Sequence, residues 1–161
     1  AQGYPVKPVT FYVPFAAGSA TDHLARALGQ GVTAETRQNV VVDNRPGANG
    51  IIAAQLVAKA PADGYAVIIA TNTTHAANEH LYKKLPYDPV QDFTPVTTLA
   101  RGGQVMLVHP QVPAKTVKEF IALARKQPGK LTFGGGSSSS RVASELFQQM
   151  AGIKLIHVPY K

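Results

Sequence analysis

The chain has 161 residues, enough for one domain with its own core or for two smaller lobes. Hydrophobic residues make up 45% of the sequence, which is typical of a globular protein and excludes an intrinsically disordered one. Sixteen Lys and Arg against nine Asp and Glu give a net charge of +7, which attracts anions. The basic residues are scattered, with no basic stripe interleaved with aromatics, and this argues against a nucleic-acid partner.

The sequence contains no Cys, which excludes disulfides and thiolate chemistry. No apolar run approaches the length of a membrane span. The first five residues carry neither a basic segment nor a hydrophobic one. Such a start would fit a chain that follows the cleavage of a secretory signal peptide.

The first predicted element is a strand over residues 9–13, which Pro14 ends because it removes a backbone donor. Almost all of the next six residues are very small. Thr21 and Asp22 are predicted to cap an amphipathic helix that follows. The first N–H groups of such a helix, together with its dipole, form a seat for an anion. The alternative is a plain strand-to-helix connection, which is common in α/β proteins.

The next patterns repeat the alternation of strand and helix. Short apolar runs predict buried strands over residues 39–43 and 65–70, and a short helix is predicted over residues 51–60. A turn cluster at residues 44–50 and a polar loop at residues 71–75 follow the two strands. This alternation predicts a parallel sheet with right-handed crossovers, in which the loops after the strands meet in one crevice.

Residues 78–99 are rich in Pro and show few regular runs. We expect them to cross the surface between two lobes, so that residues 1–101 form the first lobe and residues 102–161 the second.

The second lobe is predicted to repeat the opening pattern of the first. A strand is expected over residues 104–109, a helix over 116–126 and a strand over 131–133. A loop of Gly and Ser, residues 134–140, then precedes a helix with apolar residues on one face.

The Gly/Ser loop has two readings. Its composition is that of a flexible linker, but its position between a strand and an amphipathic helix favours a ligand loop. Four consecutive hydroxyls beside N–H groups would supply several donors to a carboxylate or phosphate oxygen. Arg141, which follows at once, would add a bidentate partner, or would be a solvated helix residue.

Catalytic and metal-binding patterns are missing from the sequence. The five His residues are dispersed, without the spacing that a metal site requires, so no metal is predicted. No G-x-S-x-G elbow, P-loop or G-x-G-x-x-G motif is present, so no catalytic set and no cofactor are predicted. His75 is the one plausible base.

A series of short motifs runs through the chain in order: VPF at 13–15, TD at 21–22, DNRPGA at 43–48, AKAP at 58–61, DGY at 63–65, LYKKLPYDP at 81–89, DF at 92–93, KQPGKL at 126–131, ELF at 145–147 and HVPYK at 157–161. In this order and spacing they resemble the Bug/TctC family, the extracytoplasmic solute-binding receptors of tripartite tricarboxylate transporters. The resemblance covers nearly the whole chain.

The resemblance implies an α/β fold like that of periplasmic binding proteins, with two lobes of mostly parallel sheets flanked by helices. Such a receptor is periplasmic, closes over a small carboxylate without chemistry, and presents it to membrane permease subunits. One loop from each lobe holds the carboxylate, a third loop at residues 71–75 completes the cleft floor, and segment 44–50 is expected to be a structural turn. The implied ligand-binding residues are Phe15, Ala16, Ala17, Gly18, Ser19, Thr21, Asp22, Thr71, Asn72, Thr73, His75, Gly135, Gly136, Ser137, Ser138, Ser139 and Arg141.

Three departures from the family pattern lead to further expectations. The Gly/Ser loop is shorter than the usual form, and Arg141 stands where the family commonly has His, which predicts a dicarboxylate or aromatic acid as ligand. The chain stops at Lys161, where a family member would still have to finish the second lobe. We therefore expect the C-terminal part to be missing and the exposed surfaces to be covered in a swapped homo-oligomer.

Two other functions stay open from the sequence. One is an α/β enzyme that uses the same loops to capture a small anionic substrate. The other is a truncated fragment that folds but no longer binds a ligand.

Overall fold

A computed structural model describes residues 3–159 of the chain. The chain divides into two compact units, unit 1 (Ala1–Leu99) and unit 2 (Ala100–Lys161). The lobe boundary predicted from the sequence lies close to this division, at residue 101.

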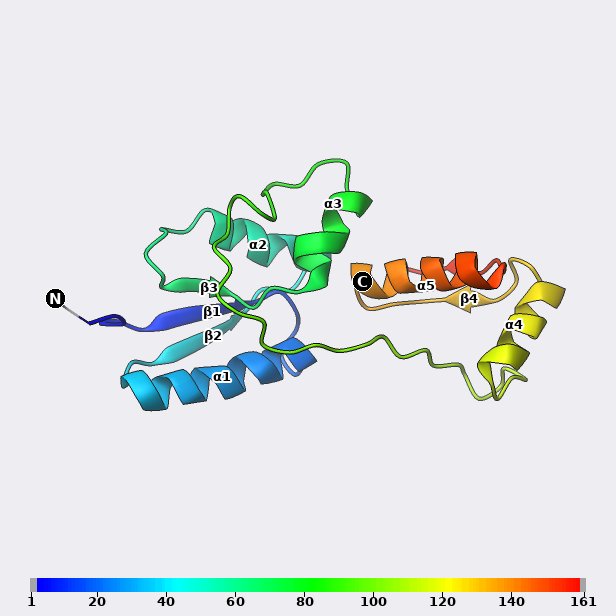
Figure 1. The fold of residues 1–161 in the computed structure, drawn as a ribbon, viewed down its shortest axis with the longest axis horizontal. Helices are drawn as coiled ribbons and strands as arrows, with labels where there is room; N and C mark the ends of the chain where they lie inside the picture. The colour runs from blue at the N-terminus through cyan, green and yellow to red at the C-terminus, as the bar shows by residue number, and fades with distance from the viewer. Residues whose placement is uncertain (1–2, 160–161) are drawn as a thin grey trace. The chain divides into compact units, whose positions relative to one another are not determined.

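Unit 1 is an α/β unit whose elements alternate along the chain (Figure 1). They are β1 (Val9–Val13), α1 (Ala20–Thr36), β2 (Val40–Asn44), the 3₁₀ turn η1 (Ala48–Gly50), α2 (Ile51–Ala58), β3 (Ala66–Ile68), the π-helical turn η2 (Thr73–Ala77) and α3 (Asn78–Leu81).

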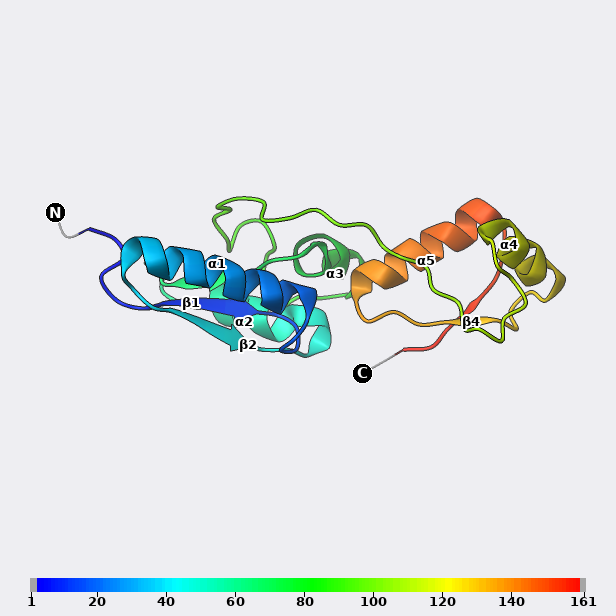
Figure 2. The same cartoon turned by 90° about the horizontal axis from the view of Figure 1, so that it is seen from below.

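The three strands form one parallel sheet in the order β2-β1-β3, with Val9 opposite Val40 and Thr10 opposite Ala66. Helices α1 and α2 lie on opposite faces of this sheet (Figures 1 and 2). The core contains Val9, Phe11 and Val13, the alternate residues of β1 that point to one face of the sheet, together with Ala25 and Ile69. The parallel sheet predicted for this part of the chain is confirmed.

Helix α1 begins two or three residues earlier than its sequence suggests. Its N-cap is Ser19, and not Thr21 or Asp22, because the Ser19 hydroxyl accepts a hydrogen bond from the Asp22 N–H at 3.2 Å. Against β2, the helix presents Gly29, where an added Cβ would lie 3.0 Å from a methyl carbon of Val40. Glycine at this position lets the helix approach the sheet closely.

Unit 2 contains α4 (Val117–Lys126), β4 (Thr132–Phe133), α5 (Ser138–Ala151) and β5 (Ile156–His157). The two short strands pair in parallel. The rings of Phe120 and Phe147 lie 6.4 Å apart between α4 and α5, and the Arg125 guanidinium donates to the Ala151 carbonyl at 2.6 Å. The strand–loop–helix pattern predicted for residues 131–150 is therefore present.

The strand predicted over residues 104–109 is wrong. This segment has no regular structure, and Val105 and Leu107 are 80% and 86% exposed. A strand needs a neighbour to accept and donate its backbone hydrogen bonds, and no strand pairs with this segment within residues 3–159. Among the same residues, no helix is both long enough and apolar enough to span a bilayer.

Candidate functional site

The loops after β1, β2 and β3 share one edge of the unit 1 sheet, because the three strands are parallel. In the order β2-β1-β3, the chain runs from β1 to β2 on one side and then returns to β3 on the other side of β1. The direction in which strands are added therefore reverses at β1. In open α/β sheets, ligands bind outside the carboxyl ends of the strands at such a reversal. The loop of small residues predicted as a ligand loop begins at this point.

This first loop is a tight turn, and the residues at its tip are exposed to solvent. The Ser19 N–H donates to the Ala16 carbonyl at 3.1 Å, and Gly18 has a φ of 83°, a conformation that favours glycine. Ala16, Ala17 and Gly18 are exposed. The N–H groups of Ala20 and Thr21, at the first two positions of α1, have no acceptor within the helix.

Asp22 is buried beside this turn, with 3% of its surface exposed. One carboxylate oxygen accepts from the Gly18 N–H at 2.9 Å and from the Arg26 Nε at 3.0 Å. The other oxygen accepts from the Asn44 side-chain amide at 3.0 Å.

The hydrogen bond from Arg26, followed by the one from the Gly18 N–H, lowers the pKa of Asp22 to about 2. Asp22 is therefore ionised at neutral pH, and the adjacent Arg26 compensates its charge. These bonds describe a carboxylate that shapes the loop, and the ligand contact predicted for Asp22 stays a prediction.

The third predicted loop, residues 71–75, is the beginning of the helical segment η2 and α3 rather than an open loop. Thr74 was not among the predicted site residues, yet it organises the turn. Its hydroxyl accepts from the Thr71 N–H at 3.1 Å and donates to the Thr71 carbonyl at 3.0 Å. Thr73 and Thr74 are buried, and Asn72 is exposed.

His75 lies in an aromatic setting. Its ring centroid is 4.6 Å from that of Phe93, edge to face, and 6.4 Å from that of Tyr87. Its Nδ1 is 2.8 Å from the Thr74 hydroxyl, and its Nε2 is buried without a hydrogen-bond partner in the described part of the chain. Burial lowers the pKa of His75, so the ring is neutral at neutral pH.

The Gly/Ser loop of unit 2 ends in a capping box at the start of α5. The Ser137 hydroxyl accepts from the Ser140 N–H at 3.3 Å, and the Ser140 hydroxyl accepts from the Ser137 N–H at 3.1 Å. Two of the four consecutive hydroxyls are thus engaged with the helix itself. An extended linker would not form this structure, so the composition of the loop reflects a helix start.

The other residues of this loop differ in exposure. Ser138 is buried, Ser139 is half-buried and Arg141 is exposed on the first turn of α5. At Gly135 an added Cβ would lie 2.5 Å from the Ser140 hydroxyl, whereas Gly136 faces open space. The backbone of the loop is thus accessible at Gly136 and tightly packed at Gly135.

The structure places the first and third predicted loops at the same edge of the unit 1 sheet and the remaining loop on unit 2. Sequence reasoning missed Asn44, Thr74 and Tyr87, whose hydroxyl donates to the Thr74 carbonyl at 2.7 Å. Asn44 was noticed only as a turn residue. Its long-range hydrogen bonds leave no local pattern in the sequence.

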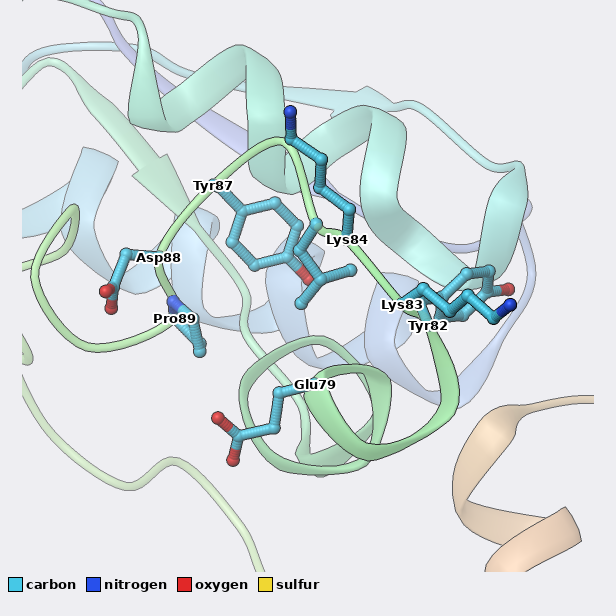
Figure 3. A pocket seen from close by; sticks show the side chains of 8 residues that line it. Glu79, Tyr82, Lys83, Lys84, Tyr87, Asp88 and Pro89 are labelled. Atoms are coloured by element: carbon cyan, nitrogen blue, oxygen red, sulfur yellow. The ribbon is translucent and has the colours of Figure 1, made fainter.

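A surface hollow of about 410 Å³ lies elsewhere on unit 1, and none of the predicted site residues lines it. Figure 3 shows that its two lysines, Lys83 and Lys84, point in different directions, and that Glu79 and Asp88 bring two carboxylates to the same hollow. Mixed charges that do not converge make a poor anion site. Within residues 3–159, no group of three or more His, Cys, Asp or Glu residues is placed so that it could bind a metal ion.

An open parallel sheet with small-residue loops at the starts of long helices defines the class of α/β ligand-binding proteins. The chain belongs to the TctC family, described as the tripartite tricarboxylate transporter family receptor, whose model matches residues 24–161. The family resemblance predicted from the motifs is confirmed.

Curated relatives agree with this assignment. The protein from the tcbD-tcbE intergenic region of Pseudomonas sp. (strain P51) is 38% identical over 98% of this chain and 47% of its own length. Protein BugT of Bordetella pertussis (strain Tohama I) is 32% identical over the whole chain and 50% of its own length. The chain therefore spans about half the length of the curated relatives that it matches.

Solved structures show the same fold. Rpa4515 of R. palustris, solved with adipate, has a TM-score of 0.93 and 41% identity over 99% of this chain and 54% of its own. MatC (Rpa3494) of Rhodopseudomonas palustris, with bound malate, has a TM-score of 0.81 and 31% identity over 98% of this chain and 54% of its own. The periplasmic binding protein BugD has a TM-score of 0.77 and 28% identity over 98% of this chain and 53% of its own. The α/β fold like that of a periplasmic binding protein, predicted from the sequence, is confirmed.

Proposed function

We propose that this chain forms part of a receptor that binds a small carboxylate, in which residues 15–22 of unit 1 and residues 134–141 of unit 2 each contribute to the site. The observation that carries the proposal is the repeated arrangement in the two units. In each, a parallel strand leads through a loop of very small residues into the N-terminus of a long helix. Such a start offers N–H groups and a positive dipole end to an anion.

The relatives support a carboxylate as the anion, because Rpa4515 was solved with adipate and MatC with malate. Main-chain N–H groups of the two loops bind one carboxylate, assisted by the hydroxyls of Ser19, Thr21 and Ser139. Residues 71–75 form the floor of the site. Arg141, exposed beside the second loop, pairs with another acidic group and favours a dicarboxylate or an aromatic acid.

The family supports a role in transport. As a member of a receptor family for tripartite tricarboxylate transporters, the mature protein is exported to the periplasm after cleavage of a signal peptide and delivers its ligand to the permease subunits. Binding proceeds by closure of two lobes around the ligand, without a chemical step.

The alternative of an α/β enzyme on an anionic substrate requires a base beside the loops. His75 is the candidate, but its Nδ1 contacts Thr74 and its Nε2 is buried next to aromatic rings. A general base must reach the proton that it removes. This geometry favours the binding receptor over the enzyme.

The proposed function is tested by isothermal titration calorimetry of the purified chain with acetate, adipate, malate and benzoate. We expect a dicarboxylate or aromatic acid to bind more tightly than acetate.

Replacement Arg141→Ala should weaken adipate binding by at least about tenfold, because a charge-assisted hydrogen bond is lost. Arg101→Ala, which removes an exposed guanidinium from the segment before α4, is the control and should change nothing. Unchanged affinity of Arg141→Ala for every acid tested would refute the role of Arg141, and a chain that binds none of them would refute the function.

We also propose that the exposed apolar side chains of unit 2 are covered in a swapped homo-oligomer. Leu107 is 86% exposed and Met150 80%, and the segment 104–109 has no strand partner within residues 3–159. Light scattering should give a mass above that of one 17.0 kDa chain. A monomeric mass without binding of a hydrophobic dye would contradict this proposal.

A further inference from the structure

The segment of residues 44–50 crosses the end of the central strand. The sheet order is β2-β1-β3, so the connection from β2 to β3 has to pass over β1. The carboxyl end of β1 is also where the first predicted ligand loop begins. Residues 44–50, the crossing segment, thus lie next to both predicted ligand loops of unit 1, residues 15–22 and 71–75. The sequence predicts this segment only as a turn.

Asn44, at the end of β2, holds the first of these loops. Its side-chain amide donates to the Phe15 carbonyl at 3.1 Å and to Asp22 Oδ1 at 3.0 Å. Its side-chain carbonyl accepts from Arg26 Nη2 at 3.2 Å. Asn44 therefore donates and accepts at the same time, which neither Asp nor Ala can do.

Asp22 links the Asn44 side chain to Gly18, at the tip of the loop. It accepts from Asn44 with one oxygen and from the Gly18 N–H, at 2.9 Å, with the other. The chain of contacts runs from Asn44 through a buried carboxylate to Gly18. Arg26 closes it by binding both Asp22 and Asn44.

The far end of the crossing segment contacts the other loop. The Asn49 carbonyl accepts from the Asn78 side chain at 3.0 Å. Gly50 has a φ of 81°, and an added Cβ would lie 2.6 Å from Thr74 Cγ2 and 2.9 Å from Pro14 Cβ. Only glycine fits between the end of β1 and the turn at Thr74.

We propose that Asn44 is a positioning residue of the carboxylate site, which fixes the backbone of residues 15–22 so that its N–H groups point at the ligand. The side chain of Asn44 is engaged within unit 1 and does not itself contact the ligand. The remainder of the crossing segment sets this loop against residues 71–75. This inference rests on the proposed function.

The test compares Asn44→Ala with two control variants. Asn39→Ala removes an exposed amide at the opposite end of β2, and Val67→Ala trims a partly buried core residue of β3. The second control should lower the melting temperature, because Val67 packs against the core, and it leaves the loop residues unchanged. It therefore separates a positioning role from a general loss of stability.

Three readouts are measured on the full chain: amide hydrogen exchange at Gly18 and Ser19, the pKa of Asp22 by NMR, and the dissociation constant for adipate. For Asn44→Ala we expect exchange at Gly18 and the dissociation constant each to rise about tenfold, because the three hydrogen bonds of the Asn44 side chain are lost. The pKa of Asp22 should rise, because one of its donors is gone. Both controls should match the wild type in all three readouts.

Some results would overturn the role of Asn44, and another would overturn only the proposed function. Unchanged exchange and an unchanged Asp22 pKa in Asn44→Ala would overturn it, as would equal losses of affinity in Asn44→Ala and Val67→Ala. If the wild type binds no adipate, the proposed function fails. Faster exchange at Gly18 in Asn44→Ala would even then support the conclusion that Asn44 fixes the backbone of residues 15–22. The two failures are thereby distinguished.

Discussion

At the scale of single residues, the question is why a buried carboxylate lies at the start of the loop that is proposed to bind an anion. Asp22 carries a negative charge where a ligand carboxylate is proposed to bind. Its oxygens, however, are used by Gly18, Arg26 and Asn44, and Arg26 compensates the charge. We expect a carboxylate so engaged to order the loop and to repel a ligand carboxylate less than an uncompensated one would. This role was visible in the sequence only as a helix cap.

His75 gives a prediction about pH. Its pKa is lowered in the folded protein by burial, whereas the unfolded chain titrates near the usual value of about 6.5. Below about pH 6.5 the unfolded state binds a proton that the folded state does not, so stability falls with acidification and rises again as the pH increases through this range.

The measurement is the urea midpoint at several pH values between about 5 and about 7.5. The variant His75→Gln should show a weaker dependence on pH in this range than the wild type. His80→Gln is the control, because the His80 side chain is 78% exposed, and it should keep the wild-type slope. Equal slopes for all three proteins would contradict the role of burial at His75.

At the scale of elements, the pattern of the sequence predicted the strands and helices that are stabilised by local signals. The strand 9–13 was found because β-branched and aromatic residues precede Pro14, and α5 because a Ser cluster opens an amphipathic run. The segment 104–109 has the composition of a strand but no neighbour within residues 3–159. Composition cannot reveal whether a partner strand exists, and this is why that prediction failed.

The same limit explains the part of the candidate site that was missed. Loops of small residues at helix starts are visible in the sequence. The hydrogen bonds of Asn44 and Thr74, and the edge-to-face contact of His75 with Phe93, depend on how distant segments meet. Such contacts follow from the strand order, which a single sequence does not give.

The start of α5 offers a test of whether its serines serve the helix, the ligand or both. Ser137→Ala should lower the free energy of unfolding of unit 2 by about 1 kcal/mol, because the capping hydroxyl is lost. Ser137→Asp retains a capping oxygen and should keep most of the stability, but its charge should repel a carboxylate and weaken adipate binding.

Urea unfolding and calorimetry of both variants check these expectations. Equal adipate affinity in Ser137→Asp and the wild type would show that no anion binds beside Ser137. Unchanged stability in Ser137→Ala would contradict the capping role.

At the scale of the whole molecule, the charge is divided unevenly between the two units. Residues 1–99 contain seven Lys and Arg and seven Asp and Glu, whereas residues 100–161 contain nine and two. The whole net charge of +7 therefore resides in unit 2. The three ion pairs of Lys or Arg with Asp found within residues 3–159 all lie in unit 1. Unit 2 thus presents cations that no acidic partner neutralises in the described part of the chain.

This asymmetry predicts that association with an anionic ligand depends on salt. The rate constant for adipate, measured by stopped flow, should fall as the ionic strength rises from about 20 mM to about 200 mM, because screening shortens the reach of the field. A monoanion such as acetate should show a smaller decrease, since it carries half the charge. A rate for adipate that is independent of salt would contradict this expectation.

The central claim is that main-chain N–H groups of residues 15–22 and 134–141 bind a carboxylate. The most direct measurement is an NMR titration of the ¹⁵N-labelled chain with adipate. We predict saturable shifts of the amide signals of both loops with a single dissociation constant. Shifts confined to the hollow around Lys83 and Lys84, or no shifts in either loop at saturating adipate, would contradict it.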